Sequence, residues 1–267
     1  MVTRAYVDTS IGQIHYRCMM PAIPTAAPPL LLLHMSPASS LIYEKFMAVM
    51  GQSRVCIAPD TPGYGNSDSH KNPPGIEDFA TVMLEMIKNL DLEQPVDVMG
   101  YHTGSMTAVD MASQDPKVIR KLILVSAPIF TTEELQRFDQ IYDTDPIWTV
   151  DGDKLLLLWK WFVDFFQVGS QNTVESAGRI FYERLSGREN YWWGHRAAFE
   201  YDFASVLSTI EHPVLILNPQ DDLVTMTSRA ASIVRNGRIH ALPNMTHGFL
   251  DTHHDEIVPV LEGFLDS

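Results

Sequence analysis

The chain has 267 residues, of which 45% are hydrophobic and 19% are charged, and 33 Asp and Glu against 19 Lys and Arg give a net charge of −14. This length suits one large α/β domain with an insertion, or two small domains. The negative charge argues against a nucleic-acid partner, which requires a basic face, and against binding to an anionic membrane surface.

Short apolar runs alternate with segments of helical spacing along most of the chain. Alternating residues on both sides of a turn at Gly12 predict an N-terminal β-hairpin. Short continuous apolar runs are typical of strands buried on both faces. They predict strands at 30–34, 55–58, 96–99, 122–125, 214–217 and 238–241. Helices are predicted at about 39–50, 76–90 and 103–113, and from about residues 227 and 255.

This alternation predicts an α/β fold with a mostly parallel, doubly wound sheet that has helices on both faces. The pattern is interrupted between residues 129 and 210, where no strand is predicted and all five tryptophans lie. We expect residues 1–128 and 211–267 to form the core domain and 129–210 a helical insertion. Most of its aromatic rings should form a packing core, and a few should line a cavity against the core domain.

Two further features concern the compartment. The two cysteines, Cys18 and Cys56, cannot form a disulfide framework or a four-cysteine zinc site, so we expect buried thiols. The N-terminal residues lack the basic start and apolar run of a signal peptide. The longest apolar runs are too short to span a membrane. The sequence therefore predicts a soluble cytoplasmic protein.

The main chemical signal is the stretch Gly100-Tyr-His102-Thr-Gly104, between a predicted strand and a predicted helix. It resembles the G-x-S-x-G nucleophile elbow of the α/β-hydrolase fold, a sharp turn whose flanking glycines let two backbones pass closely. The central residue here is His102 rather than serine. Ser105 and Thr103 are out of register with the tip, so neither is expected to replace the serine.

Other segments resemble the same family in the same chain order. His34-Met-Ser-Pro37 resembles the H-G-x-P loop, with Met35 in place of glycine. The resemblance implies that the amides of Ser36 and Thr103 form an oxyanion hole. Met35 and Tyr101 flank these positions and are expected to contact substrate, although aromatic packing is an alternative for Tyr101. His34 is expected to brace the loop.

The second half of the chain supplies the other expected catalytic groups. The stretch Asn218-Pro-Gln-Asp221-Asp222 resembles the turn that delivers the catalytic acid, with Asp221 favoured over Asp222 by register. Thr246-His247-Gly248 resembles the catalytic histidine loop. The resemblance implies that His102, His247 and Asp221 converge, with Asp221 orienting His247 as a triad acid does.

Three further parts of the sequence have expected roles: the Asp60–Ser67 turn, the insertion and residues 251–255. The stretch Asp60–Ser67 resembles a D-x-x-G-x-G-x-S turn and is expected to brace the sheet edge. In the insertion, which resembles the cap domain of many relatives, Trp159, Trp192 and His195 are the candidates for reaching the pocket. The acidic and histidine residues at 251–255 are interpreted as a helix cap rather than a metal site.

His102 leaves several functions open. It could attack an acyl carbon as a nucleophile, with His247 activating water afterwards. One of the two histidines could instead act as general base, towards water in a hydrolase or towards a substrate proton in a lyase. A metal site is a third possibility, because His102, His247 and Asp221 match the two-histidine, one-carboxylate set in type, although no spacing requires it. Loss of catalysis with retained small-molecule binding is the fourth.

We expect a hydrolase for a small, largely apolar carbonyl compound: an ester, a lactone or a compound cleaved at a C–C bond. The alternatives are a cofactor-free lyase and a non-catalytic binding protein. No organic cofactor is expected, because the chain contains neither G-x-G-x-x-G nor G-x-x-x-x-G-K-[ST]. No metal is expected, because no ligand spacing in the sequence requires one. The expected partner is the small-molecule substrate, with no nucleic acid and no membrane. The sequence does not indicate the oligomeric state.

Overall fold

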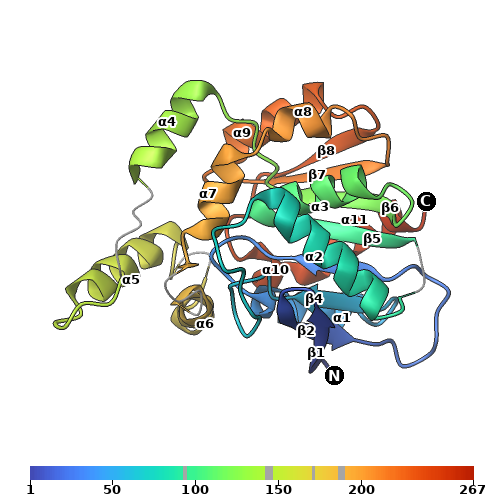
Figure 1. Ribbon diagram of the computed structural model, residues 1–267, viewed down its shortest axis with the longest axis horizontal. Coiled ribbons are helices and arrows are strands. Elements are labelled where there is room, and N and C mark those ends of the chain that lie inside the picture. The colour runs from blue at the N-terminus through green and yellow to red at the C-terminus, as the bar shows by residue number, and fades with distance from the viewer. Residues whose placement is uncertain (93–94, 142–146, 170–171, 186–189) are drawn as a thin grey trace.

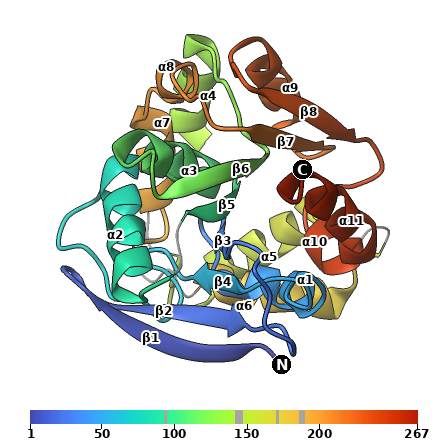
Figure 2. The ribbon, with the colours of Figure 1, turned by 90° about the vertical axis from the view of Figure 1, so that its right-hand side faces the viewer.

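The computed structural model describes residues 1–92, 95–141, 147–169, 172–185 and 190–267. Eight strands form one sheet in the order β1-β2-β4-β3-β5-β6-β7-β8 (Figures 1 and 2). The strands are β1 (Thr3–Thr9), β2 (Gly12–Met19), β3 (Leu30–Leu33), β4 (Cys56–Pro59), β5 (Val96–Tyr101), β6 (Ile119–Val125), β7 (Val214–Pro219) and β8 (Gly237–Leu242). β2 pairs antiparallel with β1 and β4, and all other neighbours are parallel.

The central strands are apolar because helices cover both faces of the sheet. Every residue of β3, β4, β5 and β7 is buried. Helices α2 (Ile76–Asn89) and α3 (Thr103–Gln114) pack on one face. Helices α1 (Glu44–Met50) and α11 (His254–Leu265) pack on the other, as Figure 2 shows. The prediction of a mostly parallel, doubly wound sheet with an antiparallel edge is therefore confirmed.

The segment from residue 129 to 210 connects β6 to β7 and is helical where the structure describes it. Its helices are α4 (Thr132–Ile141), α5 (Asp153–Phe165), α6 (Val174–Leu185), α7 (Trp193–Glu200) and α8 (Phe203–Leu207). In the parts of this segment that the structure describes, the only strand-like pairing is a single bridge from Val168 to Asn172. Figure 1 shows α4, α5 and α6 standing off one end of the sheet.

The remaining short helices follow the last two strands. α9 (Val224–Ser228) and a 3-10 turn (Arg229–Ser232) follow β7, and α10 (Phe249–Thr252) follows β8. The helix expected from about residue 227 is thus shorter and begins earlier than predicted. Across the described ranges, no helix combines the length and apolar character needed to cross a membrane.

A buried carboxylate ties the 129–210 segment to the core. Asp251, in α10, accepts hydrogen bonds from Lys45 of α1 at 2.8 Å and from Arg179 and Ser176 of α6 at 2.8 Å each. Asp251 is the buried member of these pairs, so removing Lys45 or Arg179 would leave a buried carboxylate with fewer charged partners. The interpretation of Asp251 as a helix cap is therefore wrong: its carboxylate accepts from three side chains, and no backbone amide of a described helix donates to it.

The Asp60–Ser67 turn has the bracing geometry that was expected. Asp60 is buried and accepts hydrogen bonds from the amides of Ser40 at 2.8 Å and Asn66 at 2.9 Å. It also pairs with Nδ1 of His15 at 2.8 Å. Burial by itself raises the pKa of the Asp60 carboxyl, but these hydrogen bonds and the nearby His34 outweigh it and lower the pKa from 3.8 to about 2. The ionised carboxylate thus joins β2, β4 and the turn.

This pKa predicts a pH-dependent contribution to stability. Because the folded pKa lies below the unfolded value, Asp60 should contribute about 2 kcal/mol above pH 4 that is lost as the pH falls towards 2. The difference in unfolding free energy between the wild type and Asp60→Asn, measured by urea denaturation, should shrink by that amount over this range. Asp255→Asn, at an exposed carboxylate, should show no such change. A difference independent of pH would contradict this role.

Candidate active site

His102 occupies a strained turn between β5 and α3. It is the single residue between them and has φ +50° and ψ −113°. A Cβ on Gly100 would lie 2.1 Å from the carbonyl oxygen of Gly104, and a Cβ on Gly104 would lie 2.2 Å from that of Leu33. A non-glycine residue with positive φ persists only where surrounding packing enforces it. The chain thus forms the sharp elbow that the glycines predicted, with His102 at its tip.

His102 binds the carboxylate expected to serve His247. Its Nε2 lies 3.1 Å from Oδ2 of Asp221. Ser126, the residue after β6, donates its hydroxyl to the same oxygen. The backbone amide of Leu223 donates to Oδ1 of Asp221 at 2.9 Å. Asp221 is therefore held on both oxygens, and its partner at the site is the elbow histidine.

His247 pairs instead with the neighbouring carboxylate. Its Nε2 lies 2.8 Å from Oδ1 of Asp222. Its ring lies against Phe165, with centroids 4.2 Å apart. Its Nδ1 is buried and has no hydrogen-bond partner among the described residues. The backbone carbonyl of His247 accepts from Nδ2 of Asn172, in the 129–210 segment, at 3.0 Å.

The predicted pairing of Asp221 with His247 is therefore wrong, and the size of the imidazole explains why. A serine at the tip is short and leaves space for the loop histidine to reach the acid. The His102 ring fills that space and reaches Asp221 itself. The rings of His102 and His247 then meet edge to face, with centroids 5.4 Å apart. Two His–Asp pairs replace one triad.

Burial and hydrogen bonds change the pKa values of Asp221 and His195. Burial alone raises the pKa of Asp221, but the hydrogen bond and charge of His102, with help from His247 and Ser126, lower it overall. Asp221 is thus an ionised acceptor at neutral pH. Burial also lowers the pKa of His195, on α7, well below its ordinary value. His195 is consequently a neutral polar group facing the site.

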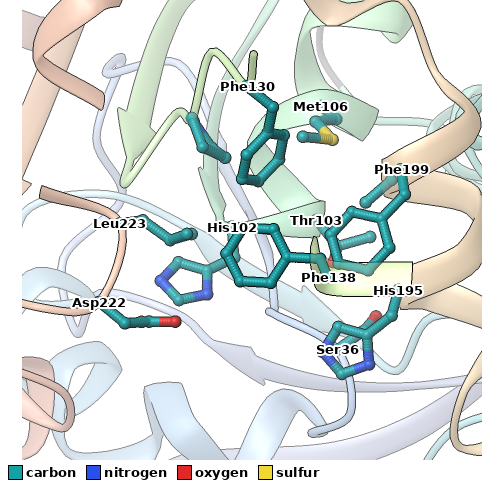
Figure 3. A pocket seen from close by; sticks show the side chains of 12 residues that line it. Ser36, His102, Thr103, Met106, Phe130, Phe138, His195, Phe199, Asp222 and Leu223 are labelled. Atoms are coloured by element: carbon teal, nitrogen blue, oxygen red, sulfur yellow. The ribbon is translucent and has the colours of Figure 1, made fainter. Parts of the chain in front are cut away.

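Two hollows meet at His102, and both are largely apolar. We call them the Phe130 hollow and the Phe165 hollow. The Phe130 hollow is lined by Ser36, His102, Thr103, Met106, Pro128, Phe130, Phe138, His195, Ala198, Phe199, Asp222 and Leu223 (Figure 3). The Phe165 hollow is lined by Met35, Ser36, Pro37, His102, Trp161, Phe162, Phe165, Phe166, Ile180, Arg184, His195, Asp222 and His247. In Figure 3, Asp222 and Leu223 lie on one side of His102, and Ser36 and His195 on the other.

The loop after β3 lies beside the elbow. Ser36 and Thr103 both line the Phe130 hollow. Within the described part of the chain, neither of their backbone amides donates a hydrogen bond, so both are available to a ligand. His34 braces the loop: its Nδ1 lies 2.7 Å from the Met35 carbonyl oxygen, and its Nε2 accepts from the Thr61 amide at 2.8 Å.

Other expected contacts divide between the pocket and the core. Met35 and His195 line the hollows. Tyr101 is buried with its ring edge-on to that of His102, 4.7 Å away, and lines neither hollow. Trp159 packs on Phe181 at 5.0 Å and also lies away from both hollows. Trp192 does not line them either. The contacts expected for these three rings are corrected to packing roles.

Several residues of the site were not anticipated. Ser126 directly follows β6 at the carboxyl edge of the parallel sheet, where ligand-binding side chains gather. This position in the sequence could have identified Ser126 as a candidate site residue. Phe130 and Phe138 carry no pattern that separates pocket residues from packing residues. Asp222 was named only as the second choice for the acid, although it lines both hollows.

Four of these side chains offer donors that a metal ion could use. One ligand atom each from His102, His247, Asp221 and Asp222 lies within 4.8 Å of the other three. They come from three separate parts of the chain: the elbow, the loop after β7 and the loop after β8. The arrangement thus supports either acid–base chemistry by two histidines or metal ligation.

Comparison with known proteins agrees with this architecture. Residues 28–167 match the family model for the alpha/beta hydrolase fold. The non-heme chloroperoxidase of Streptomyces lividans is 26% identical over 227 residues, which cover 79% of this chain and 81% of that protein. The family match spans more than half of the chain, which therefore belongs to the α/β-hydrolase-fold family.

Solved structures resemble the whole chain. An esterase from Exiguobacterium antarcticum superposes with a TM-score of 0.81 at 18% identity, covering 99% of this chain and 100% of that one. The enol-lactonase of Burkholderia xenovorans LB400 gives a TM-score of 0.80 at 18% identity, covering 98% and 100%. At this identity the likeness establishes the fold.

The elbow contacts predict a large effect of one methyl group. Gly104→Ala places a Cβ against the Leu33 backbone and should destabilise the protein by about 3 kcal/mol or more. Gly178→Ala is the matched control, because Gly178 is also in a helix but meets no atom within 4 Å. That control should be stabilising by about 0.5–1 kcal/mol. Urea denaturation measures both, and equal effects would mean that the elbow is not tightly packed.

Proposed function

We propose that the protein is a hydrolase for a small, largely apolar carbonyl compound such as an ester or a lactone, with the His102 imidazole as its reacting group. The observation that carries the proposal is the pair formed by His102 and Asp221 at the elbow tip, where the two hollows meet. The aromatic lining of both hollows supports an apolar substrate. The free amides of Ser36 and Thr103 support a carbonyl group, because such donors matter where negative charge develops on oxygen.

The pairing with Asp221 fixes which nitrogen of His102 can react. An ionised carboxylate only accepts hydrogen bonds, so the proton of the neutral imidazole resides on Nε2. Nδ1 then carries the lone pair. Of the two nitrogens, only Nε2 has a protein partner in the described ranges. His102 and Asp221 thus combine the base and the orienting acid of a triad in one pair.

The position of Nδ1 favours general-base catalysis over covalent attack. Nδ1 is adjacent to the ring carbon that bears Cβ, and bonding to an acyl carbon there needs more space than accepting a proton. In the proposed reaction, Nδ1 takes a proton from water while the water oxygen bonds to the carbonyl carbon. The amides of Ser36 and Thr103 stabilise the resulting oxyanion, and the imidazolium returns the proton to the leaving oxygen. Covalent attack by His102 is the competing mechanism.

His247 is assigned a positioning role instead of the base role expected from the sequence. Its Nε2 is bound to Asp222, and its Nδ1 is buried. Neither nitrogen therefore offers a lone pair to the hollows. The His247–Asp222 pair instead limits the rotation of the His102 ring through the edge-to-face contact at 5.4 Å.

A proton-abstracting lyase is the second candidate. The same Nδ1 can remove a proton next to a carbonyl, and the absence of a serine at the tip removes the usual route through an acyl-enzyme. A hydrolase and a lyase differ in whether oxygen from solvent enters the product. Hydrolysis in ¹⁸O-labelled water followed by mass spectrometry of the acid product distinguishes them.

The proposal predicts esterase activity that depends on His102. With a short p-nitrophenyl ester and a chelator present, the wild type should turn over. His102→Ala should reduce kcat by about 10²- to 10⁴-fold, the usual contribution of a general base. His102→Gln keeps most of the side-chain volume and should be equally impaired. His247→Ala should lose less activity than His102→Ala.

A control excludes general damage. His254→Ala alters a histidine outside the hollows and should retain activity. Each variant is compared by circular dichroism and thermal unfolding, so that lost activity is attributed to chemistry only in folded protein. Full activity of His102→Ala would disprove the assignment of His102. Accumulation of an acyl-protein in rapid-quench mass spectrometry would replace the general-base mechanism with the covalent one.

A further inference from the structure

We propose that His102, His247, Asp221 and Asp222 also bind one divalent transition-metal ion such as Zn²⁺, and that the ion switches off the imidazole base when bound. Metal binding is independent of the proposed hydrolase function. The inhibitory effect rests on that function.

The spacing of the four ligand atoms is close to that of a metal site. They lie within 4.8 Å of one another. Zn²⁺ with ligand bonds of about 2.0–2.2 Å holds neighbouring ligand atoms roughly 3.4 Å apart in a tetrahedron, and opposite atoms of a six-coordinate ion lie about 4.2 Å apart. Closure around an ion therefore requires side-chain movements of about an ångström and no rearrangement of the fold.

The chemistry of the donors selects the kind of ion. Two imidazole nitrogens and two carboxylate oxygens suit Zn²⁺, Fe²⁺, Co²⁺ or Mn²⁺. Ca²⁺ and Mg²⁺ prefer sites made of oxygen ligands alone. The two carboxylates, of which Asp221 is buried, are the negatively charged side chains of the group. A divalent cation neutralises them.

The surroundings fix one carboxylate and leave a path of entry at the other. Ser126 and the Leu223 amide hold Asp221 in place, as outer hydrogen bonds do around metal ligands. The Asp222 side chain is 35% exposed and lines both hollows, so an ion can reach the group from solvent. Nε2 of His247 already lies 2.8 Å from Asp222, so an ion can take this nitrogen in place of the hydrogen bond while the ring stays packed against Phe165.

Metal binding and base catalysis are mutually exclusive because both depend on which nitrogen of His102 carries the single imidazole proton. A neutral imidazole carries a single N–H. An ion on Nε2 of His102 displaces the proton from Nε2 to Nδ1, and no proton is lost overall. Nδ1 then has no lone pair for a water proton. The ion also replaces the hydrogen bond to Asp221 that orients the ring.

Direct binding to metal-free protein tests the site. After treatment with chelator and its removal, isothermal titration with Zn²⁺ should show one ion per chain. Asp222→Asn and His247→Ala should each weaken binding at least tenfold. His254→Ala is the control for adventitious surface binding, because His254 lies 3.6 Å from Asp255 outside the site, and it should leave the affinity unchanged.

A spectroscopic probe reports on the ligands without activity. Co²⁺ added to metal-free protein should give visible absorption bands of an ion bound by nitrogen and oxygen, and Zn²⁺ should displace them. The bands should be absent in folded His247→Ala. Lack of saturable binding in the wild type would overturn the proposal, as would binding lost in His254→Ala but kept in Asp222→Asn.

The inhibitory effect is tested separately with the p-nitrophenyl ester. Saturating Zn²⁺ should abolish turnover by the wild type, and chelator should restore it. For Asp222→Asn, the Zn²⁺ concentration that halves that variant's own metal-free rate should be at least ten times higher than for the wild type. A rate that rises with Zn²⁺ would overturn the inhibitory effect. If no form hydrolyses the ester, the hydrolase proposal fails while the titration still decides the metal site.

Discussion

The arrangement of the site depends on the close backbone contact between Gly100, Gly104 and Leu33. This contact leaves no room for a side chain at either glycine, so the chain turns sharply and holds His102 at φ +50°. The turn directs one imidazole to the carboxyl edge of the sheet. The loops after β3, β7 and β8 begin at the same edge. The backbone thus fixes the position of His102, the proposed reacting group, and packing in the core compensates for the strain.

The histidine changes the chemistry that this turn supports. A serine at the tip requires a base to remove its proton, whereas an imidazole already carries a lone pair. His102 takes over the carboxylate Asp221, and His247 moves to Asp222. The adjacent aspartates make this exchange possible, because each histidine finds a carboxylate partner without a change in the fold. The same proximity of two imidazoles and two carboxylates creates the proposed metal site.

The fold was predictable because it depends on patterns that extend over many residues. Buried strands in β3, β4, β5 and β7 appear as apolar runs, and the glycines of the elbow mark a close approach. The pairing within the site was not predictable. Register identified Asp221 but did not account for the reach of the His102 ring, which a linear pattern does not express.

The aromatic residues also show that a sequence pattern does not predict which side chains line a pocket. Tyr101, Trp159 and His195 were all candidates for the pocket, yet only His195 lines it. Each is an aromatic ring at the end of a strand or on a helix, and the direction of its side chain depends on tertiary packing. Asp251 was interpreted as a helix cap because it lies near a helix start. Its partners Arg179 and Lys45 come from distant parts of the sequence.

The tight fit of Gly194 against the loop after β3 limits how the 129–210 segment can evolve. A Cβ on Gly194 would lie 2.1 Å from Oγ of Ser36, and the Gly194 amide donates to the Tyr64 hydroxyl at 2.7 Å. Asn172 is likewise bonded to the His247 carbonyl. The segment that helps to line the two hollows is therefore not an interchangeable module. Recombination that transplants it from a relative would therefore also have to bring matching residues on the three core loops that hold Ser36, Tyr64 and His247.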